Sequence, residues 1–456
     1  MLDQADLLRR GIAVCLILTA VGVLPSTAEC ADRPNVLIVL ADDLGWGDLG
    51  CYGGQLAPTP NLDRLAAQGT RYTQFYAAAP ICSPSRCGIL TGQSPGRWRI
   101  NSYLQTRAGN KACGQADFLD AKAPTLARML KDSGYATAHI GKWHLGGGRD
   151  VKDAPLLQEY GFTKAAGTWE SPEPHAKLGI RHPPWDRRSE PEQVPRWQRT
   201  AWMVDHTLEF IGRHKDEPWF VNLWLDDTHD PFVAQQEDWE GDLKAREKLV
   251  RVLTALDLQV GRLLDGLAAA GEDRETIVLF LGDNGPSPTY QHERTGGLRG
   301  AKLSLYEGGI RTPCLIRWPD HVPAAAVNEA TLLTGVDLVP TVCALTGAAV
   351  PPGYVSDGED LSAALVGEAK PRSRPVFWEY GRDSNCFRYP GDANDRSPNL
   401  AIREGQWKLL VNADGTDVEL YDILADSKEV QNLAGDQPEV VTRLTEQVLA
   451  WRKSLP

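Results

Sequence analysis

The sequence predicts an α/β fold in which helices cover both faces of a mostly parallel central sheet. Two observations predict it: short, continuous apolar runs rich in β-branched residues, and amphipathic stretches between them. Runs of this kind are typical of strands that are buried on both faces, as parallel strands are. Alternating strands and helices in turn indicate an α/β sandwich. The predicted strands are Asn35–Leu40, Ala136–Ile140, Trp219–Trp224, Thr276–Leu281 and Cys314–Arg317.

The clearest helical patterns lie at Pro124–Ser133 and Leu249–Gly271. In the second, leucine and valine recur every three or four residues, and Gly271 marks the end of the helix. Ligands of open α/β sheets bind beyond the carboxyl ends of the strands. We therefore expect the functional residues in the segments that directly follow the predicted strands.

A second, smaller region follows a linker. Gly347–Asp357 is rich in glycine, proline and alanine, which is typical of a connecting segment. Beyond it lie three short strand-like segments and one helix, which predict a small α+β domain. They are Asn399–Arg403, Trp407–Val411, Val418–Tyr421 and Pro438–Arg452. We expect a catalytic domain over residues 32–346 and a C-terminal domain over residues 358–456.

The N-terminus has the pattern of a secretory signal over residues 1–28. Two arginines precede the apolar stretch Gly11–Leu24, and the small residues of Ser26–Ala28 offer a cleavage site. The apolar stretch is short for a membrane span, so no stable membrane partner is expected. The pattern predicts a secreted or periplasmic protein. Cys30 raises the alternative of a lipid anchor, but Glu29 before it is a poor match to a lipoprotein signal.

Charge and cysteine content narrow the classes of function. Of 456 residues, 48 are Lys or Arg and 60 are Asp or Glu, so the net charge is −12. An acidic balance argues against nucleic acid and against a general surface for polyanions. Any site for an anion must then be a local cluster of cations. Nine cysteines are too few for a disulfide scaffold of this length, and their pairing cannot be read from the sequence.

The segment Pro80–Gly92 (PICSPSRCGILTG) is the most informative one. It places a thiol, a proline and an arginine in C-x-P-x-R spacing. Pro84 suits the first turn of a helix, and the N-terminus of that helix would favour a bound anion. Without further motifs, Cys82 could equally be a buried structural cysteine at the start of a helix.

Two acidic pairs follow predicted strands. Asp42 and Asp43 come directly after Asn35–Leu40, and Asp283 and Asn284 come after Thr276–Leu281. Adjacent carboxylates repel each other unless a cation is bound, although a helix cap or a turn could explain either pair alone. Together they offer hard oxygen ligands of the kind that Ca²⁺ or Mg²⁺ prefers.

Three further segments carry basic residues at strand ends or in loops. They are Gly141–Gly146 (GKWHLG), Asp227–Pro231 (DTHDP) and Leu298–Pro313, which begins LRGAK and ends YEGGIRTP. In order along the chain, Pro80–Gly92 and these segments resemble the type I sulfatases of the alkaline phosphatase superfamily. The resemblance runs from Asn35 to about Asn432 and implies an alkaline-phosphatase-like fold.

The resemblance also implies the chemistry. In type I sulfatases the cysteine equivalent to Cys82 is oxidised by a maturation enzyme to Cα-formylglycine. One hydroxyl of the hydrated aldehyde attacks sulfur, and the other then loses its proton as sulfate leaves, so one hard step becomes two easier ones. The implied metal is Ca²⁺, with Mg²⁺ as an alternative. Its implied ligands are Asp42, Asp43, Asp283, Asn284 and the modified Cys82.

Five more residues take catalytic roles by resemblance. Arg86 belongs to the signature itself. Lys142 and Lys302 are implied contacts of the sulfate, and His144 is the implied base, a role that suits the near-neutral pKa of histidine. His229 is the implied proton donor to the leaving alcohol, in a looser match because Thr228 stands where the family usually has proline. Arg299, Glu307 and Arg311 are expected to hold their loop.

The expected substrate is a sulfated carbohydrate, which the signal and the fourteen tryptophans favour weakly. The sugar, the sulfate position and exo or endo action stay open. Gly92–Arg99, Lys164–Arg196 and Asn385–Arg388 are expected to shape the pocket. Two alternatives also remain: a phosphodiesterase or phosphonate hydrolase of the same superfamily, and an unconverted pseudoenzyme that only binds sulfated glycan.

Overall fold

The computed structural model describes residues 33–168, 177–180, 192–240, 244–288, 292–368, 370–382 and 386–456. Within it, Pro34–Pro456 form one compact unit. The expected signal, Cys30 and parts of the expected pocket segments lie outside the described residues. Among the described residues, no helix is both long enough and apolar enough to cross a membrane.

The central sheet has eight strands in the order β11-β2-β10-β9-β1-β8-β4-β5. Five neighbouring strands, β9 to β5 in this order, are parallel. They are β1 (Asn35–Ala41), β4 (Ala136–Lys142), β5 (Lys164–Thr168), β8 (Trp219–Leu225) and β9 (Thr276–Gly282). The mostly parallel sheet is therefore confirmed, and each of the first four predicted strands is one or two residues longer than expected.

The remaining three strands form the other edge of the sheet. They are β2 (Thr70–Tyr72), β10 (Cys314–Arg317) and β11 (Ala326–Asn328). β10 runs antiparallel to β9 and to β2. Among the described residues between β9 and β10 there is no long helix to cross back; they form loops and the short helix α8 (Glu307–Ile310). A parallel neighbour needs such a crossover, so the chain returns in the opposite direction.

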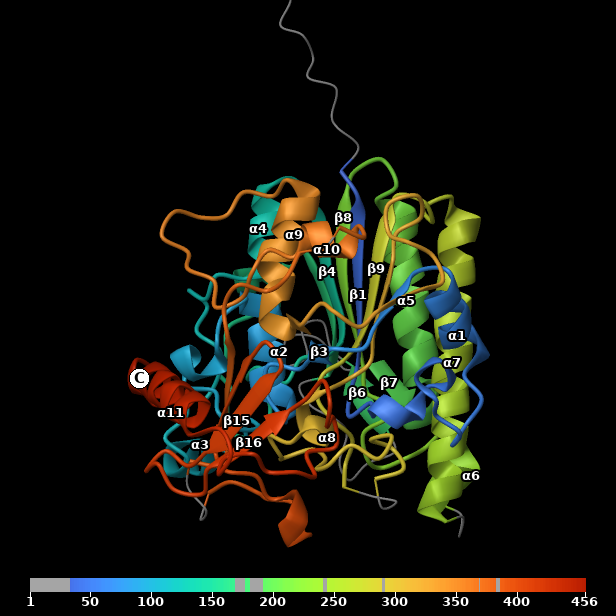
Figure 1. The fold of residues 1–456 in the computed structure, drawn as a ribbon. Coiled ribbons are helices and arrows are strands. Elements are labelled where there is room, and N and C mark those ends of the chain that lie inside the picture. The colour runs from blue at the N-terminus through green and yellow to red at the C-terminus, as the bar shows by residue number, and fades with distance from the viewer. Residues whose placement is uncertain are drawn as a thin grey trace, which may run out of the picture. The chain divides into compact units, whose positions relative to one another are not determined.

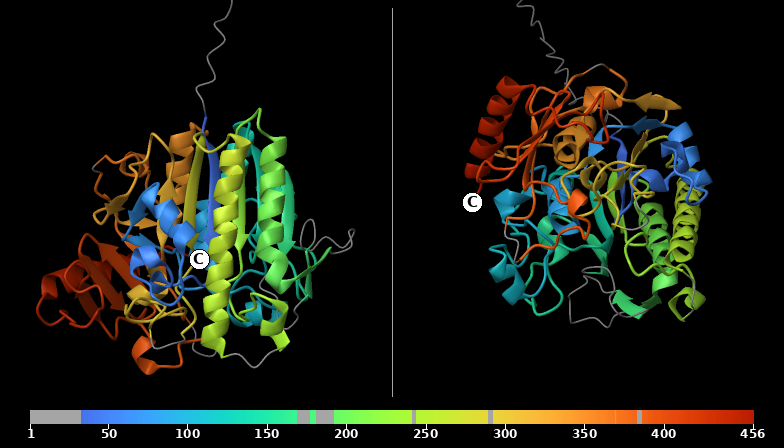
Figure 2. Two further views of the ribbon diagram at one scale, coloured as in Figure 1. Left: turned by 90° about the vertical axis from the view of Figure 1, so that its right-hand side faces the viewer. Right: turned by 60° about the horizontal axis from the view of Figure 1, so that its bottom comes forward.

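Helices lie on both faces of the sheet, as Figures 1 and 2 show. The two faces have separate apolar cores, and β1 supplies both: Val36, Ile38 and Leu40 point into one and Leu37 and Val39 into the other. One core holds α1 (Pro60–Ala67), α5 (Arg199–Arg213) and α7 (Ala245–Ala270). The other holds α2 (Cys82–Thr91), α4 (Leu126–Asp132), α9 (Leu338–Thr346) and α10 (Ser362–Leu365). Burial on both faces explains the continuous apolar runs in the sequence.

Short elements complete this part of the chain. The remaining helices are α3 (Arg107–Ala112) and α6 (Gln236–Glu240). Two small two-stranded sheets pair β3 (Phe75–Tyr76) with β12 (Leu333–Thr334) and β6 (Lys177–Ile180) with β7 (Glu192–Pro195). Single turns of 3-10 helix lie at Trp46–Asp48, Gly50–Tyr52, Pro95–Trp98, Leu157–Tyr160, Arg196–Gln198 (η5), Gly335–Asp337 and Ala393–Asp395.

The C-terminal region is a four-stranded antiparallel sheet with one helix. Its elements are β13 (Val376–Glu379), β14 (Leu400–Glu404), β15 (Trp407–Val411), β16 (Glu419–Asp422) and α11 (Pro438–Lys453). The three predicted strands and the helix are present, and β13 is a fourth strand that was not predicted. One face packs on α11 through Ile402, Leu409 and Leu444. The other face packs Trp378 and Leu410 against apolar side chains of the α/β part. The small sheet is thereby built onto the loops that follow β9.

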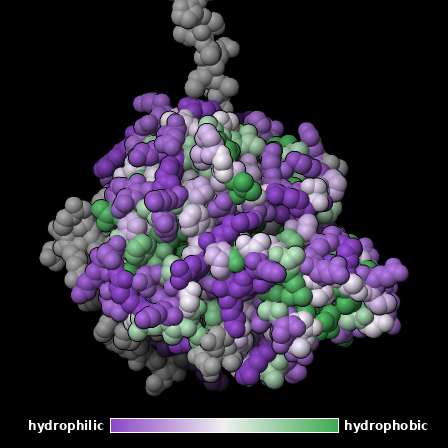
Figure 3. Space-filling view, turned by 90° about the vertical axis from the view of Figure 1, so that its left-hand side faces the viewer, coloured by the Kyte–Doolittle hydropathy of each residue, from purple (hydrophilic) through white to green (hydrophobic). Residues whose placement is uncertain are grey.

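Two further features concern the cysteines and the surface. A disulfide joins Cys113, at the end of α3, to Cys386, which follows β13 by seven residues, and these two residues are 273 apart in the chain. On the face drawn in Figure 3 the surface is mostly hydrophilic, with hydrophobic residues in small groups. Such a surface is ordinary for a large globular protein.

Candidate active site

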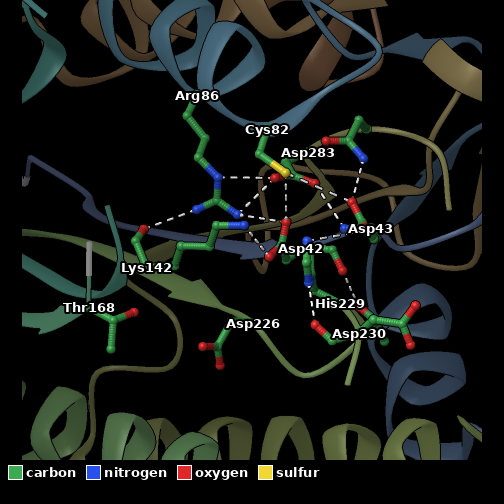
Figure 4. A network of polar contacts seen from close by, with 12 residues as sticks. Asp42, Asp43, Cys82, Arg86, Lys142, Thr168, Asp226, His229, Asp230 and Asp283 are labelled. Carbon is green, nitrogen blue, oxygen red and sulfur yellow. Dashed lines mark hydrogen bonds and ion pairs between the residues drawn. The ribbon is translucent and has the colours of Figure 1, made fainter. Parts of the chain in front are cut away.

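The ends of the parallel strands bring together residues that are far apart in the sequence. Asp42 and Asp43 follow β1, Asp283 and Asn284 follow β9, and Lys142 ends β4. These strands and β8 are neighbours in one sheet, so their carboxyl ends meet. The N-terminus of α2 lies over the same place and brings Cys82 and Arg86 (Figure 4). Residues expected from separate motifs thus form one cluster.

Cys82 is the first residue of α2 and is fully buried. Ile81 before it is extended, and Pro84 sits in the first helical turn, where its missing N–H costs nothing. The Cys82 sulfur lies 3.2 Å from Asp42 Oδ1 and 3.9 Å from Asp43 Oδ1. Burial raises the pKa of the thiol well above its usual value, and the Asp42 carboxylate adds to this effect. As a thiol, Cys82 is therefore a poor nucleophile, because the thiolate is the reactive form.

Three buried carboxylates surround the sulfur. Four residues each offer one ligand atom, and these atoms lie within 4.8 Å of one another. The residues are Asp42, Asp43, Cys82 and Asp283. The Asn284 side chain completes the set: its Nδ2 donates to Asp43 Oδ1 at 2.7 Å. The Asn284 Oδ1 atom is buried with no hydrogen-bond partner among the described residues. A buried acceptor left without a donor is costly, and a cation would satisfy it.

The donor set fits a hard divalent cation. Carboxylate and amide oxygens are the ligands that Ca²⁺ and Mg²⁺ prefer, whereas a zinc site would offer more sulfur or nitrogen. Burial raises the pKa of Asp283, and the neighbouring Asp42 carboxylate raises it further. A cation at this place would remove the repulsion between the acids. All four expected ligand residues and Cys82 thus lie together.

Three cations face these acids. Arg86 donates from Nε and Nη2 to Asp283 Oδ2 at 3.0 and 2.8 Å, and its Nη1 donates to the Lys142 carbonyl at 3.0 Å. Lys142 Nζ lies 2.5 Å from Asp42 Oδ2, and Lys302 Nζ lies 2.7 Å from Asp43. Burial alone would raise the pKa of Asp42, but these cations, Lys142 first, hold it well below its usual range. These local cations therefore allow the cluster to bind an anion although the protein as a whole is not basic.

His229 enters the cluster from the segment after β8. Its Nε2 lies 3.8 Å from Asp43 Oδ2, and its Nδ1 lies 2.6 Å from the Asp230 carbonyl. A carbonyl only accepts, so Nδ1 carries a hydrogen and Nε2 faces the cluster. Burial lowers the pKa of His229, Lys302 adds to the effect, and Asp43 opposes it. A lowered pKa makes the His229 imidazolium a stronger acid, and it reduces the fraction of His229 that is protonated at neutral pH.

His144 follows the strand that ends in Lys142, and the expected loop-holding residues make contacts around the loop that carries Lys302. His144 is buried two residues beyond β4, with a left-handed backbone (φ 54°). Arg311 donates to Glu307 at 3.3 Å, and Glu307 in turn bonds Lys408 of the C-terminal sheet at 2.9 Å. Arg299 lies over the Tyr306 ring, 3.7 Å from its centroid. The loop that carries Lys302 is thus fastened from several sides.

Sequence reasoning did not single out four buried residues, although Thr168 and Arg196 fall in the segment Lys164–Arg196 that was expected to shape the pocket. Asp226 follows β8, Thr168 ends β5, and Arg196 and Arg199 precede and begin α5. All four are buried, and Figure 4 places Asp226 and Thr168 beside the charged cluster. The pair Asp226-Asp227 after a predicted strand carries the same signal as Asp42-Asp43. That signal could have pointed to the segment.

Comparisons with known proteins identify the family. A family model described as Sulfatase matches residues 34–348. The chain belongs to the sulfatase family. A second model, described as the C-terminal part of N-sulphoglucosamine sulphohydrolase, matches residues 301–454. The resemblance stated from the motifs is confirmed, and the protein is a sulfuric ester hydrolase.

Similar sulfatases cover nearly the whole chain. Arylsulfatase A of Homo sapiens is 32% identical over 91% of this chain and 87% of its own length. N-acetylgalactosamine-6-O-sulfatase of Bacteroides thetaiotaomicron is 29% identical over 91% and 92%. The crystal structure of Ps i-CgsB superimposes with a TM-score of 0.76 at 25% identity, covering 92% of each chain. The same protein has also been solved with k-i-k-neocarrahexaose.

Proposed function

We propose that this sulfatase hydrolyses a sulfate ester of a carbohydrate, with a formylglycine made from Cys82 and a bound Ca²⁺. One observation carries the proposal: the Cys82 sulfur lies 3.2 Å from Asp42 Oδ1, inside a buried cluster of acids and cations. A thiol in this place is protonated and poorly reactive, whereas an oxygen nucleophile here would lie among groups that stabilise negative charge.

Asp42, Asp43, Asp283 and Asn284 would hold the cation together with the modified Cys82. The Asn284 Oδ1 atom, buried without a donor, and the three buried carboxylates support this assignment. A bound Ca²⁺ supplies a positive charge for the sulfate oxygens and for the hydrated aldehyde. Mg²⁺ offers the same chemistry with stricter geometry, so the identity of the ion belongs to the proposal.

The cations of the cluster bind the sulfate group. Lys142 and Lys302 approach from two sides, held by Asp42 and Asp43. Arg86 is fixed by Asp283 and by the Lys142 carbonyl, and it neutralises the acid that it touches. In a closed site such fixed charges act strongly on the transition state because water does not screen them. The arrangement therefore favours attack on a group that carries several negative oxygens.

Two histidines transfer the protons of the proposed reaction. His229 Nε2 faces the cluster and would give a proton to the departing alcohol, which a sugar needs because an alkoxide leaves poorly. His144 would take the proton from the hydrated aldehyde as sulfate leaves. Lys302 could share the first transfer, since its ammonium lies on the same carboxylate as His229.

The relatives support a carbohydrate substrate. One is named for a sulfated N-acetylgalactosamine, and one neighbour was solved with a neocarrahexaose. We further propose secretion through residues 1–28, conversion of Cys82 by a maturation enzyme in the host, and division into domains over residues 32–346 and 358–456. These proposals rest on the sequence pattern described above.

A desulfation screen tests the function. The wild-type enzyme, made with a formylglycine-generating enzyme, is offered sulfated mono- and oligosaccharides and an aryl sulfate, and free sulfate is measured by ion chromatography. We expect release from at least one carbohydrate and none from a Cys82→Ala variant. Release from the aryl sulfate only would refute a carbohydrate substrate, and equal release by the variant would refute the nucleophile.

A further inference from the structure

Behind the His229 segment lies a buried group of ions that the catalytic cluster does not use. Arg196 Nη1 lies 2.8 Å from Asp226 Oδ2, and Arg199 Nη2 lies 2.6 Å from the same oxygen. All three side chains are at most 1% exposed. Burial would raise the pKa of Asp226, but the two guanidinium groups hold it below its usual value, so the group is ionised. Asp226 directly follows β8 and begins the segment that carries His229.

Arg196 also binds the backbone of that segment. Its Nη2 donates to the carbonyl of Asp226 and, at 3.0 Å, to the carbonyl of His229. One guanidinium group therefore joins both ends of a four-residue segment. On the other side, the Thr228 hydroxyl donates to the Asp42 carbonyl. The segment is held between Arg196 and the first strand end, and His229 has little freedom to move away from Asp43.

The packing of α5 does not require these charges. The helix already buries Met203, Val204, Phe210 and Ile211. Buried ion pairs usually contribute little net stability compared with apolar residues of similar size, because desolvation opposes their attraction. What a forked guanidinium does offer is fixed geometry towards several acceptors at once. The contacts of Arg196 with two carbonyls and one carboxylate use that property.

We propose that Arg196, supported by Asp226, is a positioning residue that fixes the His229 segment and so places the His229 ring in the active site. The inference rests on the proposed role of His229 as proton donor. Arg196 does not act on the substrate; it acts through the backbone of the residue that does. Displacement of a catalytic group by about 1 Å can cost about 10²-fold in rate, so loss of this anchor has a measurable effect.

The test compares leaving groups. Arg196→Met removes the fork and Arg196→Lys keeps the charge, and kcat/KM is measured on a sugar sulfate and on an activated aryl sulfate. Arg199→Met is the matched control, because it removes a guanidinium from the same carboxylate but leaves the two carbonyl contacts. We expect Arg196→Met to lower kcat/KM about 10²-fold on the sugar sulfate and only about tenfold on the aryl sulfate. Arg196→Lys should regain part of the loss, and Arg199→Met should affect both substrates equally.

A double variant separates positioning from general damage. If Arg196 acts through His229, then Arg196→Met combined with His229→Ala should lose no more than His229→Ala alone. Losses that multiply, or an equal loss on both substrates for Arg196→Met, would overturn the inference. If Arg196→Met does not fold, as judged by circular dichroism, the same comparison with Arg196→Lys decides it.

A different result would show that the proposed role of His229 is wrong, as distinct from the positioning role of Arg196. If His229→Ala itself loses equally on both substrates, His229 is not the proton donor and that part of the proposed function is wrong. The positioning role of Arg196 is then tested by a crystal structure of the Arg196 variant. A His229 ring displaced from Asp43 supports the anchor, and an unmoved ring refutes it.

Discussion

The sulfur of Cys82 and Oδ1 of Asp42 lie 3.2 Å apart, although the two residues are 40 positions apart in the chain. The contact exists because α2 begins over the carboxyl end of β1. It places the residue that we propose is converted to formylglycine against a carboxylate that Lys142 and Arg86 already neutralise in part. In the proposed function, the maturation enzyme would therefore act on a residue that is buried in the folded protein.

The first prediction concerns Cys82 itself. In enzyme made with a formylglycine-generating enzyme, the peptide with Cys82 should be lighter than its thiol form by the exchange of sulfur for oxygen and the loss of two hydrogens. Cys82→Ala should abolish turnover and keep the fold, because little core volume is lost. Peptide mass spectrometry and circular dichroism check both statements. Wild-type rates in Cys82→Ala would contradict the proposed chemistry.

The second prediction concerns the metal. Chelation should inactivate the enzyme and Ca²⁺ should restore it, and Asp283→Ala should weaken Ca²⁺ binding sharply. The pKa of Asp283 is raised by burial and by the Asp42 carboxylate, so binding of Ca²⁺ should displace a proton. Affinity should fall as the pH is lowered, with proton release visible by calorimetry in two buffers of different ionisation enthalpy. Full activity with no metal by elemental analysis would rule the site out.

A matched acid provides the control for the metal. Asp257 is also buried, but its carboxylate caps α1 by accepting from the backbone N–H groups of Asn61 and Leu62. Asp257→Asn should lower stability and leave Ca²⁺ affinity unchanged. An equal loss of affinity in both variants would show that the effect of Asp283→Ala comes from general destabilisation.

The third prediction separates His229 from Lys302. His229→Ala should lower kcat/KM on a sugar sulfate by about 10²–10⁴-fold and much less on an aryl sulfate such as 4-nitrocatechol sulfate, which leaves without a proton. Lys302→Ala should affect both substrates more evenly, because the sulfate charge is the same in each. Steady-state kinetics of both variants on both substrates give the answer. Equal losses for His229→Ala would assign the proton to another group, with Lys302 the next candidate.

The fourth prediction is a pH dependence of stability. His139 is fully buried among the rings of Trp143, Phe162 and Trp224. Burial lowers its pKa to about 3 from an ordinary value of 6.5, and the Arg86 guanidinium adds to the effect. Between these values the unfolded chain binds a proton that the folded protein does not. Stability should therefore fall as pH drops below 6.5, by about 1.4 kcal/mol per pH unit from this residue.

The variant His139→Phe keeps a ring in the aromatic group and removes the titration. Its free energy of unfolding should depend less steeply on pH, by a difference in slope that approaches that amount as the pH falls from about 6.5 to about 5. Urea unfolding at several pH values measures the slope, which does not depend on the absolute stability of the variant. Identical slopes for the two proteins would mean that His139 does not titrate on unfolding.

The fifth prediction concerns the contact between the C-terminal sheet and the α/β part. Lys408 is fully buried between Glu307 at 2.9 Å and Glu429 at 2.8 Å. Lys408→Met leaves the buried Glu429 carboxylate without its cation and leaves Glu307 paired with Arg311 alone, and it should cost about 3–5 kcal/mol of stability. Arg443→Met breaks an exposed pair with Glu404 and should cost less than about 1 kcal/mol. Similar losses of stability in the two variants, measured by urea unfolding, would mean that the buried ion pairs of Lys408 contribute no more to stability than an exposed pair.

Much of the fold was predictable because burial leaves a simple pattern. Strands covered on both faces read as continuous apolar runs, so β1, β4, β8 and β9 were found almost to the residue. The direction of β10 was not predictable, because the sequence of a strand does not record its neighbours. The short strands β2 and β11, each three residues long, have too few residues to show a recognisable hydrophobic period.

The candidate site was predictable where short motifs follow strands. Asp42, Lys142 and Asp283 lie together as expected because the strands before them are neighbours. Arg196 was placed only within a segment expected to shape the pocket, because its contacts are with carbonyl groups of a distant segment, which have no sequence signature. Thr168, in the same segment, was not singled out because a small polar residue at the end of a strand resembles an ordinary turn residue.

The disulfide between Cys113 and Cys386 has a practical consequence for handling the protein. It closes a loop that contains Lys142, His229, Asp283 and Lys302, while Cys82 lies outside it. A protease cut anywhere inside this loop leaves two fragments that remain covalently joined. Nicked enzyme would therefore migrate as a single band until a reductant is added to the gel sample, and intact mass alone would differ only by the water taken up at the cut.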